Sequence, residues 1–402
     1  MNHIDVRLIT QSNCTGCGLC SEKCPQNCIS MAPNEEGFLF PTVDLHTCIN
    51  CGVCSSYCPI NTDGNDLKNS GKRKYFCAII SDNDKLIKSS SGGVFRIVAD
   101  WFVDNNALVC GCVYNDQMVA THIISNRIED ISRMCGSKYV QSKISHTFSA
   151  IKNNLLSGNK IMVTGTACQL AALKMYLGDE YDNLFCVEIL CHGVPSPSLF
   201  DKYVLYLERK LRGKIVDIQF RNKEKNGWGS EHRTCIVYEK NNKRLKYRPT
   251  LPAYFSAFFY GINLRESCYN CKFATPERVA DLTIGDFWGS WSKYGKRFKQ
   301  GISVIGVNTK RGEELVNNVK HNFDFFESLT EDEAFKSNDN FEHPVKRPDE
   351  RKDFYKNLPT YNGLWKRTYM TKTYRRKTIA SIYGAFVPAG LRFFIQGLKN
   401  NG

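Results

Sequence analysis

The chain has 402 residues, of which 42% are hydrophobic and 23% charged, as in an ordinary globular protein. This length is enough for two or three domains with a sizeable core. The formal net charge of +14 suggests a nucleic-acid partner, but no nucleic-acid-binding motif is present and the excess is concentrated in residues 365–377. We therefore expect no nucleic-acid partner and attribute the charge to a basic tail, or to an anionic cofactor or protein partner.

Eight of the 19 cysteines form two identical runs, Cys-x2-Cys-x2-Cys-x3-Cys-Pro, at residues 14–25 and 48–59. This spacing is typical of two [4Fe–4S] clusters in which the fourth Cys of each run binds the other cluster. The first cluster is predicted on Cys14, Cys17, Cys20 and Cys58. The second is predicted on Cys24, Cys48, Cys51 and Cys54. Zinc sites and disulfides, the alternatives, do not usually show three Cys at this spacing plus a fourth.

Residues 1–70 are the predicted ferredoxin-type module. Apolar residues on both sides of Asn34–Gly37 predict a hairpin between the two runs. Cys28 matches no further ligand spacing, so we interpret it as a small buried residue. Cluster ligands must stay thiolates, and residues 1–11 lack the apolar core of a signal peptide. We therefore expect a reducing cytoplasm, in an oxygen-poor organism.

Residues 75–158 alternate strand and helix patterns, starting with a strand over Tyr75–Ser81. Three serines and two glycines, Ser89–Gly93, then lead into the apolar helix VFRIVADWF. Such serines cap helix amides, and a helix N-terminus also attracts phosphate, so a plain cap and a phosphate site both stay open. Two strands follow, at residues 107–115 and 118–126. The stretch Cys135–Ser142 combines Gly, Lys, aromatic and hydroxyl groups that suit a nucleotide or flavin.

Residues 159–345 continue the alternation, with strands over Lys160–Thr164 and Leu184–Cys191. Cys168 lies in a strand-to-helix turn, where a thiol can be a nucleophile, a cluster ligand or a packing residue. Together with Cys191 and the pair Cys268-x2-Cys271 it makes four thiols, enough for a third [4Fe–4S] cluster or for zinc. The remaining cysteines lie mostly in apolar strands and are predicted core residues: Cys77, Cys110, Cys112, Cys135, Cys186 and Cys235.

Residues 346–402 are the predicted basic C-terminal tail. Pro388 and Arg392 interrupt its apolar end, residues 378–400, which makes a poor membrane span. Because Arg375 and Arg376 precede that end directly, it resembles an amphipathic anchor at a membrane surface, with a helix packed on the protein body as the alternative. The expected location is cytoplasmic, with peripheral contact to the inner face of the membrane as a hypothesis about this tail.

Seven ordered motifs cover about residues 10–325. They are SSGG at 90–93, GSKYV at 136–140, GTACQ at 165–169, CHGVPS at 191–196, FRNK at 220–223 with GW at 227–228, CYNC at 268–271, and ADLTIGDFWG at 280–289. Together they resemble the coenzyme F-420 hydrogenase/dehydrogenase beta-subunit family, and the fused ferredoxin module resembles a common architecture of that family. One departure is Ala167, where many relatives are expected to have Pro.

The resemblance implies FAD and a third [4Fe–4S] cluster. It implies flavin-phosphate contacts from Ser90, Ser91, Gly92 and Gly93. Further flavin or substrate contacts are implied for Gly136, Ser137, Lys138, Tyr139, Gly165, Thr166 and Arg221. The third cluster is implied on Cys168, Cys191, Cys268 and Cys271. His192 and Lys138 are the candidate catalytic residues, with a structural turn histidine as the alternative for His192. Asp281 and Asp286 are interpreted as acceptors for backbone amides in a turn.

The predicted fold is α+β or α/β, with a small ferredoxin-like module, a mixed α/β flavin-binding core and a basic helical tail. The predicted function is an iron–sulfur flavoprotein oxidoreductase. It would pass electrons between the clusters and a flavin-bound hydride donor or acceptor, which is coenzyme F-420 or another small substrate. A role in surface-polysaccharide biosynthesis is a further hypothesis from the resemblance. The alternative is a non-catalytic electron-transfer subunit whose redox partner is a ferredoxin or an enzyme subunit.

Overall fold

The computed structural model describes residues 6–61, 67, 69, 71–225, 227–228, 234–249, 253–288, 290–336 and 338–356. The chain divides into two compact units, Met1–Arg347 and Pro348–Gly402, and the candidate site lies in the first. In the second unit the structure describes helix α13 (Glu350–Lys356). The basic stretch at 365–377 and the predicted amphipathic end of the tail lie outside the described residues. Of the helices that are described, none combines the length and the apolar character needed to cross a bilayer.

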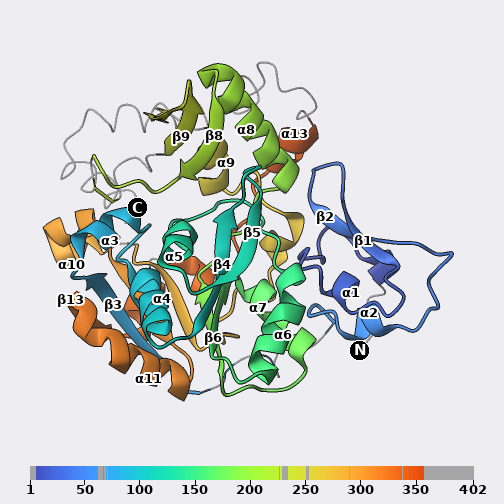
Figure 1. Cartoon of the computed structure of the whole chain (residues 1–402), viewed down its shortest axis with the longest axis horizontal. Coiled ribbons are helices and arrows are strands. Elements are labelled where there is room, and N and C mark those ends of the chain that lie inside the picture. Colours follow the sequence, from blue (N-terminus) through green and yellow to red (C-terminus); the bar gives the residue numbers. More distant parts are fainter. Residues whose placement is uncertain are drawn as a thin grey trace. The chain divides into compact units, whose positions relative to one another are not determined.

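The two cysteine runs fold around a short hairpin. Strands β1 (Ile29–Pro33) and β2 (Leu39–Val43) pair antiparallel, as the sequence predicts. The short helices α1 (Leu19–Glu22) and α2 (Val53–Ser56) hold the third Cys of each run. In Figure 1 this module lies beside α7 (Ala167–Leu177). Helix α1 contacts both α7 and the 3-10 helix η3 (Ser145–Thr147).

An eight-stranded mixed sheet forms the centre of the first unit, in the order β13-β3-β12-β11-β7-β6-β4-β5. Its strands are β3 (Lys74–Ile80), β4 (Leu108–Tyr114), β5 (Ala120–Ser125), β6 (Ile161–Gly165), β7 (Leu184–Ile189), β11 (Leu282–Asp286), β12 (Ser303–Val307) and β13 (Phe323–Leu329). Neighbouring strands from β4 to β11 run parallel, and the outer pairs are antiparallel. The predicted regions 75–158 and 159–345 thus both contribute strands to one hydrogen-bonded layer.

Alternating side chains of the strands enter two apolar cores. Met162 and Val187 pack in one core with α4 (Val94–Asp104) and α11 (Lys310–Val319). Their neighbours Val163 and Cys186 pack in the other with α6 (Phe148–Leu156) and α7. Of the six predicted core cysteines, Cys77, Cys110, Cys186 and Cys235 are buried and Cys112 and Cys135 are partly exposed. The second core also contains Leu19 and Ile60, so the cysteine module shares it with the sheet.

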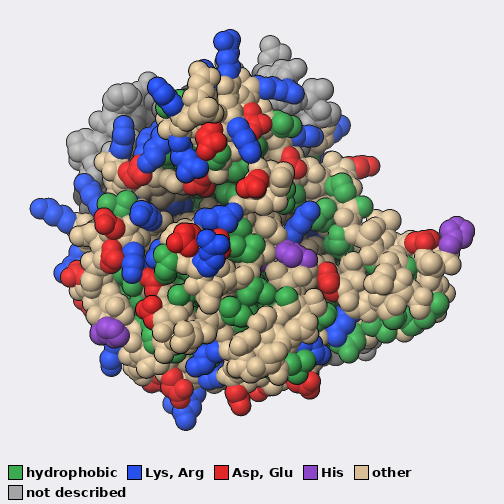
Figure 2. All heavy atoms as spheres, viewed as in Figure 1, with side chains coloured by type: hydrophobic (Ala, Val, Ile, Leu, Met, Phe, Trp, Pro, Cys, Tyr) green, Lys and Arg blue, Asp and Glu red, His purple; other side chains and the backbone are tan. Residues whose placement is uncertain are grey.

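A second, three-stranded antiparallel sheet follows the order β10-β9-β8. It consists of β8 (Lys214–Gln219), β9 (Cys235–Lys240) and β10 (Lys243–Tyr247), preceded by α8 (Pro197–Leu211) and followed by α9 (Ala253–Phe259). Figure 2 shows Lys and Arg side chains gathered over the region that α8 and this sheet occupy in Figure 1. Lys243, Arg244 and Lys246 of β10 are exposed, so part of the positive charge lies in the folded body as well as in the tail.

The remaining helices connect these layers. They are α3 (Asn83–Lys88), α5 (Ile128–Met134), α10 (Trp291–Tyr294) and α12 (Glu331–Phe335), with the 3-10 helices η1 (Val6–Leu8), η4 (Glu266–Asn270), η5 (Gly295–Gln300), η6 (Lys320–Asn322) and η7 (Asp339–Phe341). Because parallel strands end at the same edge of a sheet, the turns after β6, β7 and β11 lie at one edge. Three of the sequence motifs follow these strand ends.

Candidate functional site

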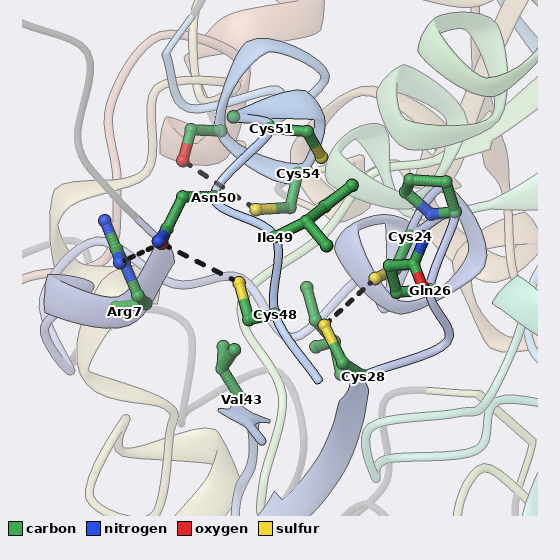
Figure 3. A pocket seen from close by; sticks show the side chains of 14 residues that line it. Arg7, Cys24, Gln26, Cys28, Val43, Cys48, Ile49, Asn50, Cys51 and Cys54 are labelled. Carbon is green, nitrogen blue, oxygen red and sulfur yellow. Dashed lines mark hydrogen bonds between the residues drawn. The ribbon is translucent and has the colours of Figure 1, made fainter. Parts of the chain in front are cut away.

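The two cysteine runs line two separate hollows. One hollow is lined by Cys14, Cys17, Cys20 and Cys58. The other, seen in Figure 3, is lined by Cys24, Cys48, Cys51 and Cys54, with Cys28 as a fifth thiol. The three closely spaced Cys of each run therefore meet the fourth Cys of the other run. This crossed donor set fits two [4Fe–4S] clusters.

The duplicated runs also repeat one backbone conformation. Gly16 and its counterpart Asn50 have φ of 68° and 55°, and Gly18 and its counterpart Gly52 have φ of 78° and 73°. A left-handed residue before and after the second Cys turns the chain so that three thiols face one centre. Gly and Asn are the residues that adopt this region most readily, which explains their place in the spacing.

Burial favours the protonated form of three thiols of the first hollow, Cys17, Cys20 and Cys58. Burial raises the pKa of Cys17 to about 12, and burial also raises the pKa of Cys20 and of Cys58. Metal coordination deprotonates such thiols because the cation supplies the missing positive charge. A cluster's ligands surround a volume, whereas ligands of one ion converge on a point. Among the described residues, no group of three or more His, Cys, Asp or Glu side chains is arranged to hold a metal ion.

Four further thiols come together from three segments. Cys168 lies in the first turn of α7 directly after β6, and Cys191 follows β7. Cys268 lies in η4 and Cys271 follows it. The thiols of Cys168 and Cys191 each interact electrostatically with Cys268 and with Cys271. The fold thus gathers the four residues that the sequence suggested as one ligand set.

The surroundings of this third thiol set argue against a nucleophilic cysteine. Burial raises the pKa of Cys168, whereas a reactive cysteine needs a lowered pKa. The N–H of Gly193 donates to Cys191 Sγ at 3.3 Å, and the N–H of Gly16 donates to Cys14 Sγ at the same distance. The same N–H···S contact, two residues after a cysteine, therefore occurs at the first and third sets. Hydrogen bonds of this kind stabilise cluster-ligating sulfur.

The three thiol sets follow one another in space. Cys58 of the first set interacts electrostatically with Cys54 of the second. Cys168 of the third set interacts with Cys17 of the first. Cys17 and Cys168 also pack against the same apolar core. The first set therefore neighbours both the second, which includes the exposed Cys51, and the third.

Arg265 fastens the cysteine module to the core. Its side chain is only 1% exposed and lies over the ring of Phe40, 4.3 Å from the ring centroid. It donates hydrogen bonds to Cys14 O at 2.6 Å, to Leu39 O at 3.0 Å and to Gln141 Oε1 at 3.0 Å. Gly16 has φ of 68°, and a Cβ there would lie 2.4 Å from Gln141 Nε2, so a larger residue would strain the backbone and displace the Gln141 side chain.

The serine–glycine turn before α4 packs tightly against the sheet. Gly92 N donates to Ser303 Oγ at 2.9 Å, and Ser91 Oγ donates to Ile302 O at 2.9 Å. A Cβ on Gly92 would lie 2.1 Å from Ala78 O, so this glycine is required by packing on β3. Gly93 starts α4 with φ of 88°, and no side chain caps that helix end. The family resemblance implies flavin-phosphate contacts from both glycines, and the fold supplies a separate packing reason for Gly92.

A polar network joins this turn to three other motifs. The Ser137 N–H donates to Ser90 Oγ at 2.7 Å. The Tyr139 hydroxyl has side-chain hydrogen bonds with Ser137 and Arg221, and burial raises its pKa. Arg221 is paired with Asp286 at 2.9 Å. The SSGG, GSKYV, FRNK and GDFW motifs therefore meet in one place, although they are up to about two hundred residues apart in the sequence.

Aromatic rings enclose the charged end of this network. The Arg221 guanidinium lies 5.1 Å from the ring centroid of Trp228 and 5.0 Å from that of Trp288. Trp228 Nε1 donates to Asp286 Oδ1 at 3.2 Å. Tyr139 stacks on Phe258 with centroids 4.1 Å apart. Asp286 thus pairs with side chains, unlike the sequence interpretation. Asp281 accepts from Cys186 N of β7 at 2.9 Å and from Thr309 Oγ1 at 2.7 Å, so it joins distant segments and does not serve a turn amide.

Several other predicted contacts have structural partners. Lys138 Nζ donates to the carbonyls of Arg133, Met134 and Cys135 at 2.6, 3.0 and 2.8 Å. These bonds use its three donors at the C-terminal end of α5, where a positive charge is favourable. Thr166 and Gln169 form a capping box at the start of α7. Gly165 and Thr166 therefore lie beside Cys168, at the third thiol set. The positive φ of Gly136 is 84°, and a Cβ there would meet nothing within 4 Å.

His192 lies beside the third thiol set in a buried polar chain. Burial lowers its pKa, and hydrogen bonds to Asn340, whose Oδ1 is 3.3 Å from Nδ1, and to the Phe259 backbone oppose that shift. Asn340 O accepts from Arg278, which pairs with Glu188 at 3.1 Å. Both ions are at most 3% exposed. Glu188 and Arg278 act electrostatically on Cys271, so a buried ion pair lies next to this set.

Sequence reasoning did not single out Arg265, Gln141, Lys223, Glu188 or Arg278. Lys223 is buried, donates to Ser91 O at 2.7 Å and to Gln300 O at 2.9 Å, and burial lowers its pKa to about 7. Their partners lie far away in the sequence, so spacing alone has no signal for them. The only sequence signal for Lys223 is its place in the FRNK motif, and the only one for Arg265 is its position three residues before Cys268.

Comparison with known proteins identifies two regions. Residues 13–62 match the 4Fe-4S dicluster domain, and residues 158–328 match the C terminus of the coenzyme F420 hydrogenase/dehydrogenase beta subunit. A chain of the F420-reducing [NiFe] hydrogenase complex from Methanosarcina barkeri is similar over 68% of this chain and 86% of its own, at 16% identity and a TM-score of 0.42. No curated protein gives a significant match. Residues 158–328 of this chain are therefore similar to the C terminus of the coenzyme F420 hydrogenase/dehydrogenase beta subunit, and a 4Fe-4S dicluster domain lies in front of that region.

Proposed function

We propose that this chain is an iron–sulfur flavoprotein oxidoreductase with three [4Fe–4S] clusters and FAD. The observation that carries the proposal is the third thiol set, whose Cys168 interacts with Cys17 of the first. Clusters pass single electrons and a flavin exchanges two as hydride, so a cluster line ending at a flavin joins both kinds of chemistry. The second, first and third thiol sets would hold that line in this order.

The polar network around Arg221 supports a flavin site. Arg221 matches the anionic groups of such a cofactor, and the rings of Trp228 and Trp288 keep water from it. Ser90 and Ser137 offer hydroxyl groups, and the N-terminal end of α4 offers a favourable place for phosphate. Tyr139 connects the hydroxyl groups to Arg221. These residues would bind and orient the cofactor.

The buried residues beside the third thiol set would compensate charge. Arg278 carries a positive charge near Cys271, and Glu188 balances it. His192 would hold a proton only at Nδ1 or Nε2, one at a time, because burial disfavours its charged form. Lys138 would act indirectly, by securing the end of α5 before the GSKYV motif.

The second thiol set is the proposed entry point for a redox partner. Cys51 is exposed, and the apolar side chains of Ile49 and Leu45 nearby in the sequence are 60% and 68% exposed. An exposed apolar rim at an electron-transfer centre suits a transient protein contact. The partner would be a ferredoxin or an enzyme subunit, and the hydride carrier would be coenzyme F420 or another small molecule.

Metal and flavin analysis of anaerobically purified protein tests the proposal. Twelve irons and twelve sulfides are expected per chain, from four in each of about three clusters, with one bound FAD. Cys268→Ser should remove about four irons and leave the N-terminal clusters, whereas the matched change Cys235→Ser in the core should remove none. About eight irons in the unchanged protein would refute the third cluster.

A hydride-transfer assay separates this proposal from a non-catalytic electron-transfer subunit. Purified protein that binds FAD and oxidises reduced coenzyme F420 or another hydride donor by itself would support catalysis. Protein that holds clusters but takes up no flavin on reconstitution would favour the electron-transfer subunit, a role that the match of residues 158–328 to a beta-subunit family also suits.

A further inference from the structure

The two N-terminal thiol sets differ by one thiol. The first hollow is lined by four cysteines and the second by five, because Cys28 joins the four of its ligand set. Cys28 follows Cys24 by four residues, and the same position after Cys58 is Thr62. The duplicated spacing that accounts for eight cysteines therefore leaves Cys28 unexplained, and its interpretation as a packing residue does not account for its place in the hollow.

Cys28 contacts one ligand of the second predicted cluster. Its Sγ is 3.3 Å from Cys24 Sγ, as the dashed line in Figure 3 shows. Cys48, another ligand of that cluster, lines the same hollow. Only 8% of Cys28 is exposed, and its carbonyl, directly before β1, accepts a hydrogen bond from the Asp44 N–H at 2.8 Å. The Cys28 thiol is therefore held in the hollow beside the Cys24 sulfur.

We infer that Cys28 is a positioning residue that donates its S–H to Cys24 Sγ and raises the reduction potential of the second cluster. Cys24, Cys48, Cys51 and Cys54 already complete the four-ligand set, so Cys28 stays a thiol and acts as a donor. Each reduction adds one electron and one negative charge to the cluster. A donor at a ligand sulfur stabilises the more negative, reduced form, and hydrogen bonds to sulfur are a known control of cluster potential.

The inference depends on the dicluster domain and is independent of the flavin and of the third cluster. It also gives the two N-terminal clusters different potentials although their ligand spacing is identical. The cluster next to the exposed Cys51 would be the one that is easier to reduce. Electrons arriving from a partner would therefore rest on the outer cluster before they pass to the inner one.

The test is an anaerobic redox titration of the full chain, followed by electron paramagnetic resonance, with iron counted in each sample. Cys28→Ala should shift one cluster transition to a more negative potential, by about tenfold in the reduction equilibrium or about 59 mV for one electron. The iron count should not change. Cys28→Ser should recover most of the shift, because a hydroxyl also donates to sulfur. Cys235→Ala, which removes a buried core thiol, should shift nothing.

The affected transition is assigned with Cys51→Ser, which alters only the second cluster. Three results would overturn the inference. An unchanged potential in Cys28→Ala would show that no donor was lost. Equal shifts in Cys28→Ala and Cys28→Ser would point to packing, and a loss of about four irons in Cys28→Ala would make Cys28 a ligand. Absence of flavin or of a third cluster changes none of these readings.

Discussion

Gly18 and Gly52 occupy equivalent positions in the two cysteine runs, and comparing substitutions at the two tests how the cysteine module contacts the core. Each starts a short helix in the same left-handed conformation, with φ of 78° and 73°. Changing either to Ala imposes about 1–2 kcal/mol of backbone strain. A Cβ on Gly18 would in addition lie 2.6 Å from Ser145 Oγ and 2.9 Å from Ser145 Cβ, whereas a Cβ on Gly52 would meet nothing within 4 Å.

The extra contact decides the size of the expected difference. Ser145 lies in η3, on the core side of the contact with α1, and overpacking of this kind costs about 1–3 kcal/mol. We expect Gly18→Ala to open the module–core contact about 5- to 150-fold more often than Gly52→Ala, since 1–3 kcal/mol corresponds to that range.

Native-state hydrogen exchange under anaerobic conditions measures this opening. In Gly18→Ala, amides of α1 and of the segment from η3 into α6 should exchange faster. In Gly52→Ala, faster exchange should stay within the module, around α2. Equal exchange of the η3 and α6 amides in the two variants would show that the Ser145 contact has no part in docking.

Four further outcomes follow from buried groups and from the clusters. Arg265→Met leaves Leu39 O and Gln141 Oε1 without their hydrogen-bond donor. The free energy of unfolding measured by denaturant titration should therefore fall by roughly 2–6 kcal/mol. The control Arg244→Met, at an exposed position, should change it by no more than about 0.5 kcal/mol. Because burial lowers the pKa of Lys223 to about 7 from 10.5, the unfolded chain binds more protons between these values and stability should rise with pH across them. Lys223→Met should flatten that rise, and an unchanged slope would contradict it. Iron removal should speed amide hydrogen exchange first in residues 13–62 and only later in the eight-stranded sheet, because the ligated cysteines are linked through the metal. Simultaneous loss of protection in both regions would argue against this order.

Local sequence patterns determined most of the elements and the crossed cysteine pattern. The strands over Tyr75–Ser81, Lys160–Thr164 and Leu184–Cys191 appear as β3, β6 and β7 with small shifts at their ends. Apolar alternation and turn residues act over a few neighbours, so a sequence can specify such elements by itself. The cysteine spacing likewise carries its own geometry, since the left-handed residues lie between the ligands.

The tertiary structure decided which of those patterns come together. The sequence could not separate a helix cap from a phosphate site at Ser89–Gly93, and it offered Cys28 no partner. Only the fold brings Ser90 to Ser137 and Arg221 to Asp286. The physical reason is that these contacts depend on strand order and on docking of the module, which are long-range properties of the packed chain. Sequence spacing determined which cysteines can bind clusters, and the fold determined which set lies next to which.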